Sequence, residues 1–467
     1  SFDCEKIGFF FDGHKIYSSP TAKEWFGMSL LGEKPKNDIL KRNSKKTHRQ
    51  MMAEIVGIDY RKYEPFLRLT PLQFRITTEF RKRYIIKKED MVVGLIFGGA
   101  DRWPKQLPVE ISVRLIDAIY QMFKCKIILF GGPGEEERNR EIISQAHSPI
   151  IDAGAGNDLT EFPALVNVCN YIISTDSLGL HIALALKKKT ICLVGPTPPN
   201  EIHMYGLGEK VIARSECVAC LKKECESMQK IDVSDVLHVL ERLTRITLAI
   251  IVTSYKEPNT GKAIERILHQ DIMYPFRIIV AAPDEETQKI VESYSKHDNR
   301  VSLFKDPGKG KSYALNLLLK EVKEDILILS DGDVYVGNTA ILEIVSLFND
   351  SSVGCVCGRP VPQETKDNKY GYWAHFLFDE AHRIRKNAYI DNAFIECSGY
   401  LFAFRNHVIG SFPLDTAEDT IIPYIFWNRG YYIGYTEKAE VFVKNVDNWE
   451  DWIKQKVRTS LAHERLN

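Results

Sequence analysis

The 467-residue sequence has no excess of charge of either sign and no long hydrophobic run. Lysine plus arginine and aspartate plus glutamate both total 62, so the formal net charge is zero. A protein that binds nucleic acid through bulk charge is basic, so the balance argues against that class. The longest apolar runs, such as residues 247–253, fall well short of the ~18 residues that a membrane-spanning helix needs. The sequence therefore predicts no integral membrane segment.

Cysteine is scarce, and most of its ten copies lie in apolar runs such as KCKIILF and TICLVG. Such positions are typical of buried free thiols and favour a reducing compartment. The first residues show neither an initiator methionine nor the basic and apolar regions of a signal peptide, so we expect a fragment of a longer chain. With 44% hydrophobic and 27% charged residues, the composition is that of an ordinary globular protein.

Two series of alternating apolar strands and amphipathic helices follow a mixed, basic segment of the chain. The first series runs from MVVGLIFGG to the helix SDVLHVLERL, and the second includes ITLAIIVTSY, FRIIVAA, VSLFKD and DILILS. Near-continuous apolar strands between helices indicate parallel sheets that are covered on both faces. We therefore predict an α/β chain with three parts, at residues 1–90, 91–244 and 245–467.

The segment DILILSDGDVYV places Asp331 and Asp333 at the carboxyl end of a predicted strand. Carboxylates at i and i+2 point the same way and can hold one divalent cation, which can bridge a diphosphate. Ligands of open α/β sheets bind at such strand ends. The alternative is that both aspartates only close a turn, because Asp-Gly is a turn signal.

Other polar segments follow neighbouring strands and are expected at the same edge of the sheet. TSYKEP follows the first strand, AAPDEE the second, and KDPGKGK precedes a helix whose first amides could bind an anion. Asp284 could accept a hydrogen bond from a base or a ribose, or it could be a solvated loop residue. The candidate donor-binding residues are Ser254, Tyr255, Glu257, Asp284, Lys309, Gly310, Lys311, Asp331 and Asp333.

Two polar pairs lie further along the chain. Glu418 and Asp419 open an apolar helix, where carboxylates also suit the helix dipole, so helix capping is an alternative role. Gln455 and Arg458 are three residues apart, which puts both on one face of a helix. Taken alone, this second pair is equally compatible with an ordinary polar helix face.

In their order and spacing, these segments resemble family 2 glycosyltransferases, the inverting class that uses nucleotide-diphospho-sugars on a GT-A fold. The resemblance covers about residues 248–458, nearly half of the chain. It rests on SYKEP, the loop of Asp284, GKG followed by Asn316, DGD, and AED followed by Q-x-x-R. Thr459 stands where processive members of the family carry tryptophan.

The family 2 resemblance implies a role for each motif. The DGD aspartates, Asp331 and Asp333, would hold a divalent cation, Mn²⁺ or Mg²⁺, and the donor diphosphate. Asp419, beside Glu418, would be the catalytic base that removes the acceptor hydroxyl proton while C1 is attacked from the opposite face. Three residues would lie on the acceptor or diphosphate side: Gly399, Gln455 and Arg458.

The first strand–helix series resembles family 9 glycosyltransferases, the heptosyltransferase family, whose GT-B fold has two Rossmann-like halves around the donor. FGGADRWPKQLP, ILFGGPGEEE and STDSLGLHIALALKKK carry this resemblance from about residue 92 to 243. It implies a complete second lobe at 91–244 after a remnant of a first lobe at 1–90. The implied donor loop contains Asp176, Ser177 and His181.

The family 9 pattern is incomplete in this chain. Leu178 stands in place of a glycine of the donor loop, and Asp101 occupies the position of a lysine. The catalytic carboxylate of the first lobe would precede the first residue. We therefore expect features of a donor site without a demonstrable active centre, and His181 taken alone is compatible with an ordinary helix histidine.

A cluster of three cysteines, Cys217, Cys220 and Cys225, lies in a polar loop. Three thiols at this spacing could bind zinc, with His203 as a distant fourth candidate. A structural zinc site normally has four ligands, so the spacing favours loop packing and predicts no stoichiometric zinc.

The resulting hypothesis is an inverting glycosyltransferase that acts on a cell-surface glycan or a lipid-linked precursor. Its predicted location is the cytoplasm, including the inner face of the cell membrane, with peripheral membrane association and no nucleic acid partner. Two alternatives stay open at this point: a nucleotidyltransferase that makes a nucleotide sugar, and a non-catalytic glycan-binding scaffold. TSYKEPNTGK matches poorly the Gly-rich, basic loop of nucleotidyltransferases.

Overall fold

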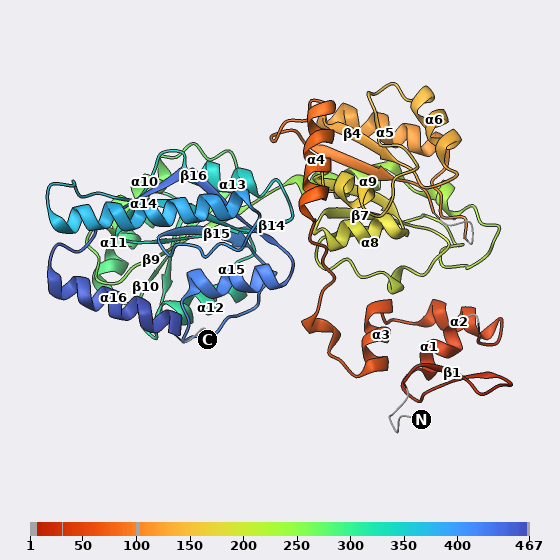
Figure 1. The fold of residues 1–467 in the computed structure, drawn as a ribbon, viewed down its shortest axis with the longest axis horizontal. Coiled ribbons are helices and arrows are strands. Elements are labelled where there is room, and N and C mark those ends of the chain that lie inside the picture. Colours follow the sequence, from red (N-terminus) through yellow and green to blue (C-terminus); the bar gives the residue numbers. More distant parts are fainter. Residues whose placement is uncertain (1–6, 30, 100–102, 465–467) are drawn as a thin grey trace. The chain divides into compact units, whose positions relative to one another are not determined.

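The computed structural model describes residues 7–29, 31–99 and 103–464, with side chains through residue 457. Two units divide the chain, residues 1–244 and 245–467, and each is treated separately below. Figure 1 shows that each unit contains its own twisted sheet with helices packed on it. The chain is therefore α/β in both units, as the alternation of strands and helices predicted.

A six-stranded parallel sheet forms the centre of the first unit, in the order β5-β4-β3-β6-β7-β8. Its strands are β3 (Val92–Ile96), β4 (Lys126–Phe130), β5 (Ile151–Asp152), β6 (Tyr171–Thr175), β7 (Lys189–Val194) and β8 (Gly208–Ile212). Counted within the sheet, this order is 3-2-1-4-5-6, the Rossmann order. The order reverses between β3 and β6, and ligands of such sheets bind beside that switch point.

Helices cover both faces of this sheet because its strands are apolar on both sides, and a hydrophobic core lies on each face. One core includes residues of α5 (Val109–Phe123), α6 (Glu136–Gln145) and α9 (Val233–Thr244). The other includes residues of α4 (Pro71–Arg83), α7 (Glu161–Val166) and α8 (Leu178–Ala185).

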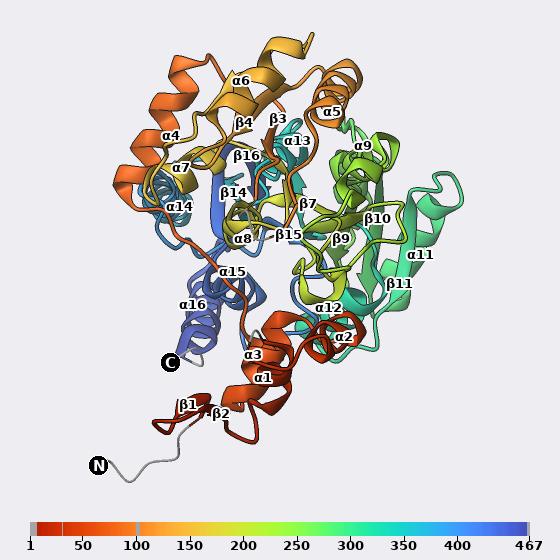
Figure 2. The ribbon, with the colours of Figure 1, turned by 90° about the vertical axis from the view of Figure 1, so that its right-hand side faces the viewer.

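Among the described residues before β3, the only strands form an antiparallel hairpin rather than a parallel sheet. The hairpin strands are β1 (Phe9–Phe11) and β2 (Ile16–Ser18), and the short helices are α1 (Lys23–Met28), α2 (Lys36–Asn43) and α3 (His48–Val56). Figures 1 and 2 both show this hairpin beside α1. Whether this segment is a remnant of a first lobe stays a prediction.

The second unit has an eight-stranded mixed sheet in the order β11-β10-β9-β12-β15-β14-β16-β13. Strands β11, β10, β9 and β12 are parallel, whereas β15 is antiparallel to both of its neighbours. The strands are β9 (Leu248–Thr253), β10 (Phe276–Ala282), β11 (Val301–Lys305), β12 (Ile326–Asp331), β13 (Val334–Val336), β14 (Val353–Pro362), β15 (Leu401–Arg405) and β16 (Tyr432–Val443).

The helices of the second unit also lie on two faces of their sheet, as Figure 1 shows for α10 and α13 against α12 and α15. One hydrophobic core contains alternate residues of β9 with α10, α11 and α13, and the other contains the intervening residues with α12 and α15. The helices are α10 (Thr260–Leu268), α11 (Glu285–Ser295), α12 (Lys311–Glu321), α13 (Ala340–Leu347), α14 (Lys369–Ile390), α15 (Glu418–Asn428) and α16 (Trp449–Glu464).

We predict that residues 245–467 fold as an isolated fragment, because both hydrophobic cores of this unit consist only of its own residues. Cooperative thermal unfolding followed by circular dichroism will test this. A matched fragment that begins at residue 254 lacks β9, whose neighbours are β10 and β12, and should not fold. Non-cooperative melting of the longer fragment would contradict the prediction.

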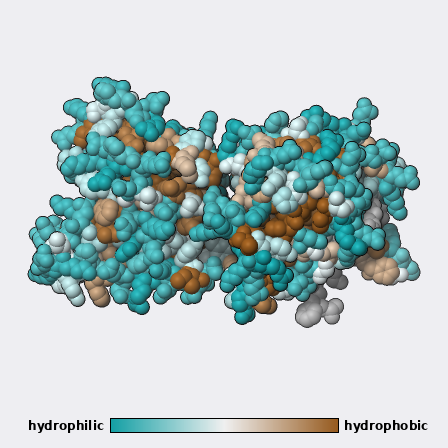
Figure 3. Space-filling view, turned by 90° about the horizontal axis from the view of Figure 1, so that it is seen from above, coloured by the Kyte–Doolittle hydropathy of each residue, from teal (hydrophilic) through white to brown (hydrophobic). Residues whose placement is uncertain are grey.

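The surface drawn in Figure 3 is mostly hydrophilic, with several separate hydrophobic patches. No helix in the part of the chain that the structure describes is long and apolar enough to cross a membrane. This agrees with the absence of long apolar runs in the sequence.

Candidate functional site

The edge of the second sheet where β9 and β12 end carries the DGD motif. The two strands pair in parallel, with Asp331 opposite Thr253, so the loops after them begin side by side. The Thr253 hydroxyl donates a hydrogen bond to Asp331 Oδ1 at 2.9 Å. The strand order changes direction here, since β12 lies on the side of β9 opposite to β10 and β11. This is the position at which open α/β sheets bind ligands.

A cavity of about 630 Å³ lies at this edge. It is formed by the ends of β9 and β10 and by the loop before α12. Its lining residues are Thr253, Ser254, Tyr255, Ala281, Pro283, Asp306, Gly308, Gly310 and Lys311. Four of the sequence-predicted donor residues, Ser254, Tyr255, Gly310 and Lys311, therefore lie together around one cavity. Its volume is in the range of sites that enclose a small molecule.

Lys311 connects the DGD motif to the Glu418–Asp419 pair. Its Nζ lies 2.7 Å from Asp331 Oδ1 and 2.7 Å from Glu418 Oε1. Although burial disfavours the charged amine, the two carboxylates raise the pKa of Lys311 well above its usual range. Because Lys311 stays charged, it can hold both acidic motifs at one place although they are far apart in the sequence.

Asp333 adds a second carboxylate beside Asp331; the residue as a whole is exposed, although protein atoms surround part of its carboxyl group. Burial of its carboxyl, followed by the negative charge of Asp331, raises the pKa of Asp333. A bound cation would relieve this repulsion, and an all-oxygen ligand set suits hard divalent cations such as Mg²⁺ and Mn²⁺. The residues present therefore fit the divalent cation that the family 2 resemblance implies.

Asp419 lies at the start of α15, next to Gly399 in the segment before β15. Burial, followed by the charge of Glu418, raises the pKa of Asp419 to about 6. A side chain at position 399 would crowd the carboxylate, since a Cβ there would lie 3.1 Å from Asp419 Oδ2. Glycine thus leaves space directly beside a carboxylate whose pKa is close to neutrality, as general bases require.

Two of the predicted donor residues have hydrogen-bonding roles within their loops. Asp284 caps α11 by accepting hydrogen bonds from Thr287, and its Oδ2 accepts the Lys256 amide at 2.9 Å. Burial opposes its ionisation, but these backbone N–H donors lower the pKa of Asp284. Glu257 accepts from the amide and the side chain of Asn259. Both carboxylates fix the loop after β9, and a direct role in donor binding stays a prediction.

The remaining predicted residues of this unit lie in the loop before α12 and on α16. Lys309 is exposed just before α12, with its Nζ 5.2 Å from the centre of the Tyr313 ring. Gln455 lines a small cavity of about 100 Å³ between α14 and α16, next to Trp452. Arg458 is in α16 as well, and its side chain lies outside the described residues.

In the first unit, a cavity of about 580 Å³ lies at the switch point between β3 and β6. The predicted loop residues Asp176, Ser177 and His181 line it, together with the exposed Leu178 at the start of α8. Asp101 lies outside the described residues. The structure thus brings the three predicted residues to one cavity at a ligand-binding edge.

Two residues of this cavity were not predicted from the sequence. Lys105 Nζ lies 2.8 Å from Asp176 Oδ2 and also donates to the Asp176 carbonyl. Glu135 accepts the amides of Gly99 and Gly132, and so joins the loops after β3 and β4. Lys105 ends the string DRWPK, four residues after Asp101, which occupies the position of a family 9 lysine. This short separation could have indicated Lys105 as a site residue, whereas nothing in the sequence singled out Glu135.

These two sites belong to glycosyltransferase domains. Residues 249–410 match the family model "Glycosyl transferase family 2", and residues 33–231 match "Glycosyltransferase family 9 (heptosyltransferase)". The chain therefore contains one domain of each family, and the GT-A and GT-B fold classes expected from the sequence are confirmed. The family 9 match begins at residue 33, well before β3.

Similarity to individual proteins is partial. Lipopolysaccharide heptosyltransferase 2 of Escherichia coli (strain K12) is 30% identical over 111 residues, 23% of this chain and 30% of the relative. The O-antigen chain rhamnosyltransferase WbaN of Salmonella anatum is 27% identical over 177 residues, 35% of this chain and 54% of the relative.

A solved family 9 glycosyl transferase from Veillonella parvula DSM 2008 shares 19% identity over 43% of this chain and 60% of its own, with a TM-score of 0.38. The chain spans about a third to a half of the length of the curated relatives it matches.

Proposed function

We propose that the second unit transfers a sugar, with inversion, from a nucleotide-diphospho-sugar to a hydroxyl of a glycan or a lipid-linked precursor. The observation that carries this proposal is the double ion pair of Lys311. It joins Asp331, at the end of β12, to Glu418, at the start of α15, beside the 630 Å³ cavity. The two ion pairs hold both acidic motifs beside one cavity, which supports their use in a single site.

The proposed mechanism is a single displacement at C1 of the donor sugar. Asp331 and Asp333 would hold a divalent cation, which supplies charge neutralisation for the leaving diphosphate. Asp419 accepts the proton of the acceptor hydroxyl, while Gly399 leaves room for the reacting sugar. Gln455 and Arg458 would orient the acceptor or the diphosphate from α16. Ser254, Tyr255 and Gly310 would surround the nucleotide.

The first unit has a second candidate role, supported by its own cavity at the switch point. We propose that Asp176, Ser177 and Lys105 bind a nucleotide diphosphate or its sugar there, next to the N-terminus of α8. His181 would border the same ligand. The relatives of this unit are named as heptosyl- and rhamnosyltransferases, which supports a nucleotide sugar as the ligand class. Sugar transfer by this unit is not part of the proposal.

The lipopolysaccharide heptosyltransferase and O-antigen rhamnosyltransferase relatives support a role in the synthesis of a cell-envelope polysaccharide. We propose the cytoplasm as the location, at the inner face of the membrane where lipid-linked acceptors are available. Binding of the purified chain to anionic lipid vesicles, compared with neutral ones, tests the membrane part of this proposal.

The test of the proposed function is a screen of the purified chain against nucleotide sugars with Mn²⁺. We expect release of a nucleoside diphosphate that depends on the cation and on Asp333. Release of pyrophosphate from a nucleoside triphosphate and a sugar phosphate would instead identify a nucleotidyltransferase. Glycan binding without donor turnover would identify a scaffold.

The activity should fall at acidic pH, because Asp419 must be unprotonated to accept a proton. With a pKa of about 6 in the folded protein, kcat should drop about tenfold per pH unit below pH 6 and level off above it. A pH profile of kcat at saturating donor and Mn²⁺ will show this limb. A flat profile between pH 5 and 8 would argue against Asp419 as the base.

A further inference from the structure

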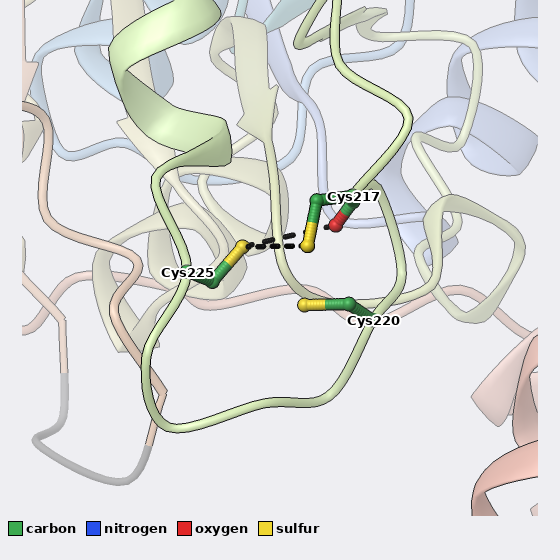
Figure 4. A group of neighbouring side chains, drawn as sticks. All are labelled: Cys217, Cys220 and Cys225. Carbon is green, nitrogen blue, oxygen red and sulfur yellow. Dashed lines mark hydrogen bonds between the residues drawn. The ribbon is translucent and has the colours of Figure 1, made fainter.

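The loop between β8 and α9 brings three cysteine sulfurs together in the first unit. The Sγ atoms of Cys217, Cys220 and Cys225 all lie within 4.8 Å of one another. Figure 4 shows the three side chains pointing toward a common centre from different parts of the loop. The Sγ atoms of Cys217 and Cys225 are 3.5 Å apart. The sequence spacing favoured loop packing without a metal. The convergence of the three sulfurs favours metal binding instead.

The sulfur distances fit a bound metal better than a disulfide. Thiolates at about 2.3 Å from a tetrahedral zinc ion lie about 3.8 Å apart, within the range of distances in this cluster. A disulfide requires about 2.05 Å between its sulfurs, much less than the 3.5 Å between Cys217 and Cys225. Among the described residues, this is the one group of three or more histidine, cysteine or acidic side chains with ligand atoms close enough for a metal.

Backbone amides point at two of the sulfurs in the same way. The amide of Lys222 donates to Cys220 Sγ and that of Ser227 to Cys225 Sγ, both at 3.5 Å. In each case the donor is two residues after the cysteine. Hydrogen bonds to sulfur stabilise the thiolate, which is the form that binds metals, and they orient it.

The loop is also tied to the rest of the unit on both sides of Cys220. The amides of Ala219 and Leu221 donate to the carbonyls of Gly195 and Pro196 at 3.0 Å each. Arg42 donates to the Cys220 carbonyl at 2.5 Å. Backbone hydrogen bonds of residues 219–221 therefore hold the loop in place without a contribution from the thiols, which favours a preformed site.

The cluster supplies three ligands, so water would fill the fourth position of a tetrahedral site. Ser227 Oγ, 3.1 Å from Cys225 Sγ, accepts a hydrogen bond from that thiol. His203, the fourth candidate from the sequence, does not join the cluster, and its Nδ1 accepts the Tyr205 amide at 3.0 Å.

We propose that Cys217, Cys220 and Cys225 bind one zinc ion as thiolates, with water in the fourth position. The site would fix the segment after β7, because the loop is bonded to Gly195 and Pro196. The next residue, Thr197, donates to Asp176 Oδ2 at 3.2 Å in the switch-point cavity. The metal would thus be structural and would stabilise the rim of that cavity in the first unit.

The test uses the full chain, purified under reducing conditions without chelator. Metal analysis should find about one zinc per chain, and substitution with Co²⁺ should produce sulfur-to-cobalt charge-transfer absorption. Cys220→Ser should weaken Zn²⁺ binding by about 100-fold or more, since it removes a direct ligand. Cys125→Ala, which changes a buried cysteine outside the cluster, should leave the metal content unchanged.

A second measurement does not depend on the variant folding. In the wild-type chain, added Zn²⁺ should protect the three cluster cysteines from alkylation, as mapped by mass spectrometry, and a chelator should expose them. The proposal is overturned if the reduced chain takes up no zinc, if zinc fails to protect these thiols, or if a Cys217–Cys225 disulfide forms in its place. None of these readouts depends on sugar transfer by the second unit.

Discussion

Replacing Asp419 by asparagine should reduce kcat by about 100-fold or more, the usual scale for the loss of a general base. Asparagine keeps the size of the aspartate side chain. It cannot take up the acceptor proton. Binding of the nucleotide-sugar donor, measured by calorimetry with Mn²⁺ present, should change little because Asp419 is assigned to the acceptor hydroxyl.

The matched control is Glu418→Gln, one residue earlier on the same helix. Glu418 pairs with Lys311 instead of the acceptor, so its loss should cost less activity than the loss of Asp419. The charge of Glu418 also raises the pKa of Asp419, so its removal should move the acidic limb of the pH profile to lower pH. A larger loss from Glu418→Gln would show that Glu418 is the base. Loss of donor binding in Asp419→Asn would assign Asp419 to the nucleotide site.

The position of the second site could be predicted because it depends on strand ends. Apolar strands such as DILILS deliver the residues that follow them to one edge of a parallel sheet, whatever the details of packing. The sequence alone therefore groups Asp331, Ser254 and Gly310. The same reasoning grouped Asp176 and Ser177 in the first unit.

The ion pairs of the two lysines, Lys311 and Lys105, could not be predicted. They depend on the directions of side chains from segments that are far apart in the sequence. A donor-binding role for Lys311 stays a prediction, and the structure adds that its amine bridges Asp331 and Glu418, which no sequence spacing encodes. Lys105 reaches Asp176 across the switch point. The convergence of the three cysteines depends in the same way on how one loop folds back on itself, and spacing alone did not reveal it.

Replacing Asp331 or Asp333 by asparagine should abolish transfer, with a loss of about 1,000-fold or more in kcat/KM, because a cation that offsets the leaving diphosphate is worth several kcal/mol. The two variants should differ in stability. Asp333 is exposed and its charge is repelled by that of Asp331, so Asp333→Asn should not lower the melting temperature. Asp331→Asn leaves Lys311 with only one carboxylate and should lower the melting temperature slightly.

The control for these variants is Asp298→Asn. Asp298 forms an ion pair with Arg300 and belongs to neither acidic motif. It should retain full activity and the same Mn²⁺ dependence. Titration of Mn²⁺ separates the possible outcomes, because weakened cation binding raises the Mn²⁺ concentration needed for half-maximal activity. If Asp331→Asn and Asp333→Asn both turn over donor at the wild-type rate at limiting Mn²⁺, the two aspartates only close the turn after β12 and hold no cation.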